Sequence, residues 1–210
     1  MDRLPSPTQL ASLYDDAYDG ATTGYFAKVD SKMRRSLHRV RQLRRRVSGG
    51  RFLDIGCSGG FMVEAARLQG FGAHGVEVDP KSVAYAREHY PANAYFHGTV
   101  QAFAESHGGE PLFDAVYCSE VIEHVPESRS FVAAIAGLMR PGAVLYITTP
   151  DISHWRRPKE LTNWDAFCPP SHCVFFNPAN LTRLLAAHDL VVFKRFISLK
   201  PGVKLLARKS

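Results

Sequence analysis

Short β-rich runs alternate with longer helical patterns from residue 51 to the end of the chain. Runs of strand length rich in β-branched and aromatic residues predict strands over 51–55, 72–77, 94–97, 113–118, 143–149, 190–197 and 203–207. Apolar residues at helical spacing predict helices over 61–69, 80–89, 129–139 and 178–188, with a shorter helix over 100–105. This alternation predicts an α/β fold, a doubly wound and mostly parallel sheet.

The final two strands differ from the others in how they are connected. Residues 198–202 between them are too few for a crossover helix, so an antiparallel hairpin at a sheet edge is expected. The chain of 210 residues with 45% hydrophobic residues fits one domain.

A basic helix is predicted over residues 31–47, which hold eight of the 26 Lys and Arg residues of a chain with a net charge of +6. Its apolar residues recur at helical spacing, so one stripe is expected to dock on the sheet while the arginines face water. They are Met33, Leu37, Val40, Leu43 and Val47. A solvated face, an acidic substrate, an anionic membrane surface and RNA all remain open as reasons for the charge.

The long irregular stretch 150–177 contains Trp155, Trp164, Phe167, Phe175 and Phe176. It follows the fifth strand and is expected to lie over the carboxyl edge of the sheet, where open α/β folds bind ligands. It is predicted to be either a substrate lid or a packed structural flap.

The chain has no segment that predicts export or membrane insertion. No run approaches ~18 consecutive apolar residues, and Met1–Leu10 lacks the apolar core of a signal peptide. The four cysteines form no CxxC pair, so reduced thiols in a cytoplasmic protein are expected. They are Cys57, Cys118, Cys168 and Cys173.

The run RFLDIGCSGGF at 51–61 predicts a strand that ends in a glycine-rich turn and opens a helix. Such a turn alone also suits the phosphate of a dinucleotide or of a nucleoside triphosphate. The spacing disfavours both ligands, because Ser58 and Phe61 replace two glycines of GxGxxG and no Lys-Ser/Thr pair follows.

Two carboxylates give the turn a more specific meaning. Asp54 precedes the first glycine, and Glu77 ends the next strand in GVEVDP. A carboxylate at the second strand tip can accept hydrogen bonds from ribose hydroxyls, and Asp54 can receive a cationic amino group or orient the turn. The pair predicts a ligand with a ribose and a positively charged amino-acid tail. The alternative is that Glu77 only caps the following helix.

These motifs resemble class I S-adenosylmethionine-dependent methyltransferases of the type 11/type 23 group, which includes the ubiquinone-biosynthesis O-methyltransferases. Five segments carry the resemblance in order: DIGCSGG at 54–60, GVEVDP at 75–80, FDAVYCSEVIEHVP at 113–126, LMRPGAVLYITTP at 138–150 and the closing helix at 175–185. The family pattern is DIGCGTG, so Ser58 and Gly59 are departures from it. The adenine-flanking turn falls on Gly98, Thr99 and Val100, without the family's frequent acidic residue near Thr99.

The resemblance implies a Rossmann-like seven-stranded sheet in the order 3-2-1-4-5-7-6 and S-adenosylmethionine as cofactor, released as S-adenosylhomocysteine. The cofactor-binding residues that it implies are Asp54, Gly56, Cys57, Ser58, Gly59, Gly60, Phe61, Glu77, Val78, Thr99, Val100, Ser119 and Glu120. Residues 1–48 resemble a helical cap of the same domain, in which Tyr14, Tyr18, Tyr25 and Phe26 fold over the cofactor or pack on the sheet edge. Residues 49–210 then form the methyltransferase domain.

The reacting centre is expected in SEVIEHV at 119–125. Methyl transfer from a sulfonium needs alignment of the nucleophile and removal of its proton, so His124, with Glu123 beside it, is the candidate catalytic base. The alternative is that His124 holds the loop through a backbone hydrogen bond.

The same motif suggests a metal site by resemblance. In related ubiquinone O-methyltransferases and small-RNA 2′-O-methyltransferases, ExxEH or ExxHH binds a divalent ion, which here implies Glu120, Glu123, His124 and His172 for Mg²⁺, Mn²⁺ or Zn²⁺. The motif is also widespread in methyltransferases for which no metal is implied, so a metal-free site is the first expectation. A zinc site of Cys168, His172 and Cys173 is disfavoured, because the last two are adjacent.

The expected activity is O-methylation of a small or lipid-linked molecule such as a phenol, sugar or glycan. An RNA 2′-O-methyltransferase and a non-catalytic cofactor-binding domain remain as alternatives. Salt dependence separates the first two, because RNA binding weakens steeply with ionic strength.

Overall fold

The computed structural model describes residues 29–107 and 112–210. Its helices are α2 Val29–Arg44, α3 Phe61–Leu68, α4 Pro80–His89, α5 Val100–Ser106, α6 Ser128–Leu138 and α7 Pro178–Ala186, with short 3₁₀ turns η2 Ile122–His124 and η3 Leu161–Asn163. Its strands are β1 Arg51–Ile55, β2 Gly72–Glu77, β3 Ala94–His97, β4 Phe113–Ser119, β5 Met139–Pro150, β6 Leu190–Arg195 and β7 Gly202–Lys209.

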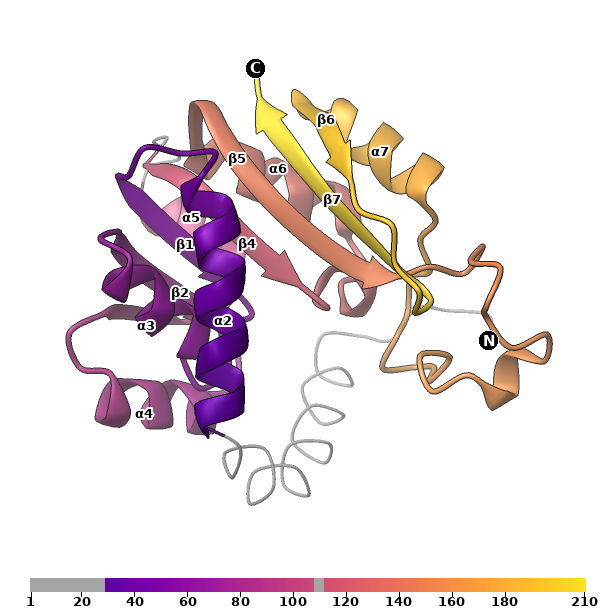
Figure 1. Ribbon diagram of the computed structural model, residues 1–210, viewed down its shortest axis with the longest axis horizontal. Coiled ribbons are helices and arrows are strands. Elements are labelled where there is room, and N and C mark those ends of the chain that lie inside the picture. The colour runs from indigo at the N-terminus through magenta and orange to yellow at the C-terminus, as the bar shows by residue number, and fades with distance from the viewer. Residues whose placement is uncertain (1–28, 108–111) are drawn as a thin grey trace.

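The strands form one seven-stranded sheet in the order β3-β2-β1-β4-β5-β7-β6 (Figure 1). Neighbours from β3 to β5 run parallel, while β7 is antiparallel to both β5 and β6. The predicted order and the terminal hairpin are therefore confirmed. In this arrangement the carboxyl ends of β1, β2, β4 and β5 share one edge of the sheet.

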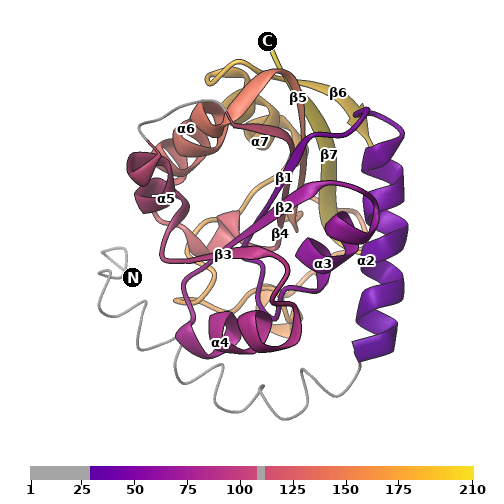
Figure 2. The same cartoon turned by 90° about the vertical axis from the view of Figure 1, so that its left-hand side faces the viewer.

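Helices cover both faces of the sheet (Figure 2). One buried cluster joins the sheet to α5, α6 and α7 through residues such as Val100, Ile135 and Leu181. A second cluster joins the other face to α2 and α3 through residues such as Leu43 and Val63. The double layer fixes the strand tips, and with them the site, in a rigid frame.

The basic helix docks as its apolar stripe predicts. Val40 and Leu43 are buried, and the other stripe residues pack partly against the same cluster. The helix runs over Val29–Arg44 instead of 31–47. It ends early because the backbone N–H of Arg46 bonds the carbonyl of Leu43 at 2.7 Å, a three-residue spacing that tightens the last turn.

Three other predicted boundaries are wrong by two to four residues. β5 begins at Met139 instead of Ala143, because a register shift lets Met139 pair with Phe113 ahead of the Pro-Gly pair. α7 ends at Ala186, since the N–H of His188 bonds the carbonyl three residues back, at Leu185. β6 ends at Arg195, two residues before the predicted end.

The stretch after β5 is largely irregular, as predicted, but its aromatic residues differ in environment. Trp164 and Phe176 are 8% and 4% exposed, whereas Trp155 is 78% exposed. A bridge between Asp151 and Phe176 and a 2.9 Å bond from the N–H of Ile152 to the carbonyl of Phe176 join its two ends. The stretch is thus anchored at its base by buried side chains and presents at least one aromatic ring to solvent.

The predicted aromatic cap, with Tyr14, Tyr18, Tyr25 and Phe26, lies outside the described residues. All four cysteines are free thiols. In the described ranges, no helix is long and apolar enough to cross a bilayer.

Candidate functional site

Two buried carboxylates meet at adjacent tips of the parallel sheet. Ile55 at the end of β1 lies opposite Val76 of β2, so Asp54 and Glu77 come from neighbouring strands at one edge. The backbone N–H groups of Gly56 and Cys57 both bond the carbonyl of Val76, at 2.9 and 3.1 Å. These bonds fasten the glycine turn directly against the Glu77 strand.

Glu77 is held by backbone donors from both sides. Its Oε2 accepts the N–H of Ser58 at 2.8 Å, and its Oε1 accepts those of Val78 and Asp79 at 2.7 and 3.0 Å. A carboxylate has about four lone-pair positions, so Oε2 retains room for one more donor. The following helix is capped by Asp79, which accepts the N–H of Ser82 at 2.8 Å, so Glu77 is not its cap.

The pKa values of both carboxyls, Asp54 and Glu77, are raised. Burial, followed by the charge of Glu77, raises the pKa of Asp54 well above its ordinary range. Burial also raises the pKa of Glu77, although its backbone hydrogen bonds oppose that shift. Arg39 of α2 lowers the pKa of Asp54 as a smaller effect while donating to Tyr117 Oη at 2.7 Å. A cationic group entering here relieves the repulsion between the two acids.

The turn between the two carboxylates has backbone conformations that side chains disfavour. Gly56 has φ 71°, and a Cβ there would lie 2.5 Å from Val121 Cγ2. Ser58 takes a φ of 45° with a side chain present. Its Oγ is buried and has no hydrogen-bond partner among the described residues, which leaves it for a ligand.

Other residues predicted to bind the cofactor have side chains that are buried in the core, cap a helix or lie at the surface. Cys57, Phe61 and Val100 are at most 5% exposed, so their side chains belong to the core. Thr99 Oγ1 caps α5 by accepting the N–H of Ala102 at 3.2 Å. Val78 is 43% exposed beside Glu77, which suits an apolar surface for a flat ring.

A chain of hydroxyls holds the first acidic residue of the SEVIEH motif. Thr148 Oγ1 donates to Glu120 Oε1 at 2.7 Å, so Ser119 Oγ donates to Thr148 at 2.7 Å. Glu120 also has a φ of 56°, a strained conformation of the kind found at functional sites. β5 therefore positions the residues that leave β4.

Glu123 is a buried carboxyl with one unused oxygen. Its Oε2 accepts from Thr149 Oγ1 at 2.9 Å, and its Oε1 has no partner in the described part of the chain. Burial, followed by Glu120, raises the pKa of Glu123 to about 8. The side chain is 1% exposed, so it does not contact solvent directly.

Two histidines face Glu123 with defined tautomers. His124 Nδ1 lies 2.9 Å from the Ser171 carbonyl, and His172 Nδ1 lies 2.7 Å from the Ala166 carbonyl. A carbonyl only accepts, so each Nδ1 bears a proton, and in the neutral form of each ring Nε2 bears the lone pair. The two rings pack edge to face, with their centroids 4.5 Å apart. Burial, followed by the charge of His172, lowers the pKa of His124.

Three of the four predicted metal ligands come together. One ligand atom each from Glu123, His124 and His172 lies within 4.8 Å of the others. Glu120 is not in this group, and its Oε1 accepts from Thr148 Oγ1 at 2.7 Å, so its role as a ligand stays a prediction. Cys168 is exposed and is not in the group either.

Sequence reasoning missed the residues that hold these groups in place. Arg39 lies in the basic helix, where nothing distinguishes it from its neighbours. Thr148 and Thr149 stand in the ITTP run at the end of β5, and their place at a strand tip was the available signal. The carbonyls that orient the histidines leave no mark in the sequence.

Solved structures share this fold. An N1-methyltransferase of 1,6-didemethyltoxoflavin from Burkholderia thailandensis, crystallised with S-adenosylhomocysteine, superposes with a TM-score of 0.71 at 18% identity, covering 100% of this chain and 93% of that one. The cyclase SpnF matches with a TM-score of 0.64 at 15% identity, over 82% and 81% of the two chains. Because a methyltransferase and a cyclase both match, these similarities establish the fold alone.

Curated relatives are more similar in sequence. The ubiquinone biosynthesis O-methyltransferase of Aromatoleum aromaticum is 39% identical over 107 residues, which are 49% of this chain and 45% of the relative. That of Pectobacterium atrosepticum is 34% identical over 125 residues, 54% and 51% of the two chains. The chain thus spans about half the length of these relatives. A family model described as a methyltransferase domain matches residues 25–194, and the chain therefore belongs to that family.

Proposed function

We propose that this chain is an S-adenosylmethionine-dependent methyltransferase that methylates an oxygen of a small or lipid-linked acceptor. The observation that carries the proposal is a pair of buried carboxylates on either side of the glycine turn, Asp54 and Glu77, whose pKa values are both raised. A methyl donor with a ribose and a cationic amino-acid tail complements this pair. The ubiquinone biosynthesis O-methyltransferases among the relatives support oxygen as the target atom.

The described residues divide into three binding roles. Glu77 Oε2 accepts a ribose hydroxyl at its remaining lone pair, and the Ser58 hydroxyl bonds the ligand that approaches the turn. Asp54 pairs with the amino group of the tail. The exposed side chain of Val78 lies against the adenine.

His124 supplies the base. When bound, the methyl donor presents an electrophilic methyl carbon on a positively charged sulfur. His124 Nε2 takes the proton of the acceptor hydroxyl, while its Nδ1–H stays on the Ser171 carbonyl and holds the ring. The acceptor oxygen would form the bond to the methyl carbon as the carbon–sulfur bond breaks, and the donor would leave as neutral S-adenosylhomocysteine. The stretch 150–177, with Trp164 and Phe176 packed inside, serves as the acceptor-binding lid.

Transfer of a labelled methyl group tests this proposal. The purified chain is incubated with methyl-labelled donor and with metabolite, lipid and RNA fractions in turn. Label is expected in a small or lipid-linked product, as a methyl ether that is not hydrolysed by base. The rate of transfer is expected to change little with salt. Label in RNA, with a steep loss of rate at high salt, would establish the competing activity. An absence of transfer despite cofactor binding would support a non-catalytic domain.

Cofactor binding is expected to release protons. Burial and Glu77 raise the pKa of Asp54, and a cationic amino group favours its charged form, so the carboxyl loses protons as the ligand binds. Calorimetry with S-adenosylhomocysteine at slightly acidic pH should therefore give an enthalpy that varies with the ionisation heat of the buffer. The dependence should disappear in Asp54→Asn. An enthalpy that is independent of the buffer in the unmodified protein would place the amino group elsewhere.

A divalent ion at Glu123, His124 and His172 is a second candidate feature of the site. The unpartnered Glu123 Oε1 and two imidazoles whose Nδ1–H groups bond carbonyls fit such an ion, since ligating histidines are commonly oriented in this way. Mixed oxygen and nitrogen donors suit Mn²⁺ or Zn²⁺. A bound ion would acidify an acceptor hydroxyl.

Removal of metal decides between the two forms of the site. In the metal-free form, chelator treatment and added Mn²⁺ or Zn²⁺ leave the methyl transfer rate unchanged. If the ion is used, chelation abolishes transfer and the metal restores it. Calorimetric titration of the chain with Mn²⁺ alone, repeated on His172→Gln, gives a readout that does not depend on activity.

A further inference from the structure

The three most exposed large apolar side chains of the described residues lie in one patch. Ile197, Trp155 and Leu199 are 98%, 78% and 70% exposed, whereas the next, Val191, is 56% exposed. Ile197 and Leu199 belong to the tip between β6 and β7, and Trp155 belongs to the stretch after β5. We call these three residues the apolar tip.

Hydrogen bonds hold the two segments of the apolar tip side by side. His154 Nε2 bonds the carbonyl of Ser198 at 3.1 Å, and the N–H of Asp151 bonds the carbonyl of Pro201 at 3.4 Å. The pairing of β5 with β7 continues up to this point, where Pro150 lies opposite Gly202. The patch is therefore a built feature of the fold.

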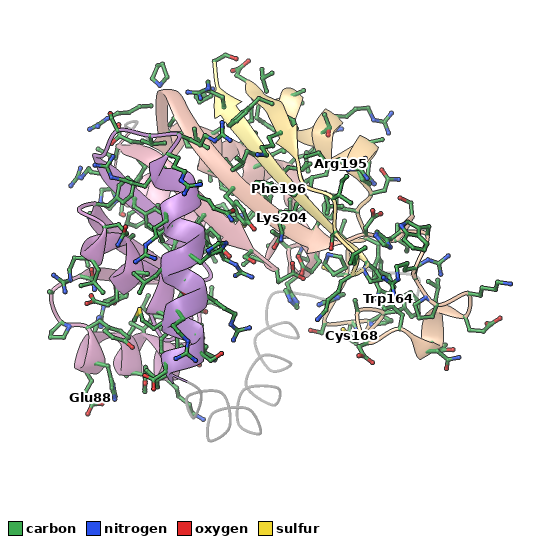
Figure 3. The ribbon with its side chains drawn as sticks, in the orientation of Figure 1. Glu88, Trp164, Cys168, Arg195, Phe196 and Lys204 are labelled. Atoms are coloured by element: carbon green, nitrogen blue, oxygen red, sulfur yellow. The ribbon has the colours of Figure 1, made fainter. Side chains whose placement is uncertain are left out.

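Basic residues predominate beside the apolar tip along both segments, and the first segment is bounded by the buried Asp151 and the exposed Glu160. Residues 152–159 and 190–204 contain seven Lys and Arg residues and no Asp or Glu. The guanidinium of Arg156 stacks over the Trp155 ring at 5.4 Å, and Lys200 is exposed between Leu199 and the turn. Figure 3 shows Arg195 and Lys204 on the two arms of the same hairpin.

The apolar tip also lies at the reacting edge of the sheet. Thr149, which holds Glu123, is paired with Val203 just beyond the hairpin tip. In Figure 1 the tip between β6 and β7 lies beside the end of β5 and the stretch that follows it. A surface bound by this patch would meet the protein on the side where its acceptor enters.

We propose that the apolar tip docks this protein on an anionic lipid bilayer. Tryptophan and aliphatic side chains insert at the boundary between headgroups and acyl chains, while flanking Lys and Arg residues pair with anionic headgroups. Nucleic acid fits less well, because Ile197 and Leu199 offer no aromatic face on which bases stack. Docking goes beyond the proposed methyl transfer and would deliver a lipid-linked acceptor to the site.

Vesicle binding tests the proposal without cofactor or acceptor, so its result is independent of the proposed enzyme activity. The full chain is sedimented with vesicles of phosphatidylcholine alone or mixed with phosphatidylglycerol. It should bind the mixed vesicles, and a variant with Trp155→Ser, Ile197→Ser and Leu199→Ser should bind at least about tenfold more weakly. The matched control, Leu68→Ser with Val191→Ser, replaces exposed apolar residues elsewhere and should bind normally.

Tryptophan fluorescence reports insertion directly. The chain has two tryptophans, and in a Trp164→Phe background the emission of Trp155 should shift to the blue when anionic vesicles are added. Failure to bind the mixed vesicles, equal binding by the triple-serine variant, or emission that does not shift would overturn the proposal. So would a dimer in solution, or binding to single-stranded RNA, that the triple-serine variant abolishes while vesicle binding persists.

Discussion

Replacement of His124 by glutamine is expected to lower kcat by about 100- to 10,000-fold, the usual contribution of a positioned general base. Glutamine keeps an N–H for the Ser171 carbonyl but cannot take a proton from the acceptor. Burial and the charge of His172 lower the pKa of His124 below its ordinary range, which favours the neutral form that can act as a base. The kcat of the unmodified enzyme should be flat above neutral pH and fall only in more acidic solution. The assay is initial-rate methyl transfer between pH 5 and 9.

His172→Gln provides the matched control, because the ring centroids of His172 and His124 lie 4.5 Å apart. Removing the charge of His172 should raise the pKa of His124, so the acidic limb of the rate profile should move to higher pH while the plateau kcat changes little. Equal losses of kcat in both variants would contradict the role of His124 as sole base and favour a metal held by both histidines. A rate that still rises near pH 8 would point to Glu123 instead.

Glu77→Gln is expected to weaken binding of S-adenosylhomocysteine by roughly 10- to 150-fold, since a hydrogen bond to a charged group contributes about 1.5–3 kcal/mol. Glutamine can still accept the N–H groups of Val78 and Asp79 at one oxygen. The amide nitrogen of the glutamine then replaces Oε2 opposite the N–H of Ser58 and the ribose hydroxyl. It cannot accept a hydrogen bond from either group. Isothermal titration calorimetry measures the effect.

Two controls distinguish loss of the ribose contact in Glu77→Gln from loss of folding. Glu88→Gln removes an exposed carboxylate of α4 and should bind the ligand normally. Urea unfolding of both variants shows whether the Glu77→Gln protein remains folded at the assay temperature. A folded Glu77→Gln protein with unchanged affinity would mean that the ribose lies elsewhere.

Most of the fold could be predicted because hydrophobic periodicity encodes it directly. β1, β2 and β3 have the predicted bounds, since each is a short run of strand length that is followed by a turn or a bend. Errors occur where backbone hydrogen bonds at an element's end decide the boundary. The start of β5 depends on pairing between Met139 and Phe113, a contact distant in sequence that periodicity does not contain.

The candidate site was less predictable because its geometry depends on contacts between distant segments. Asp54 and Glu77 could be paired from the sequence, since parallel neighbouring strands end at the same edge. The bond from Thr148 Oγ1 to Glu120 Oε1 could not be predicted, because Thr148 stands on another strand. The approach of His172 to His124 was suggested only by resemblance, and two backbone carbonyls fix it.

A crystal structure of this chain with bound S-adenosylhomocysteine tests the central claim most directly. The account predicts the ribose within hydrogen-bond distance of Glu77 Oε2, the amino group of the tail beside Asp54, and the sulfur directed toward His124. A ligand bound away from the tips of β1 and β2, or a glycine turn filled by protein side chains in the complex, would contradict it.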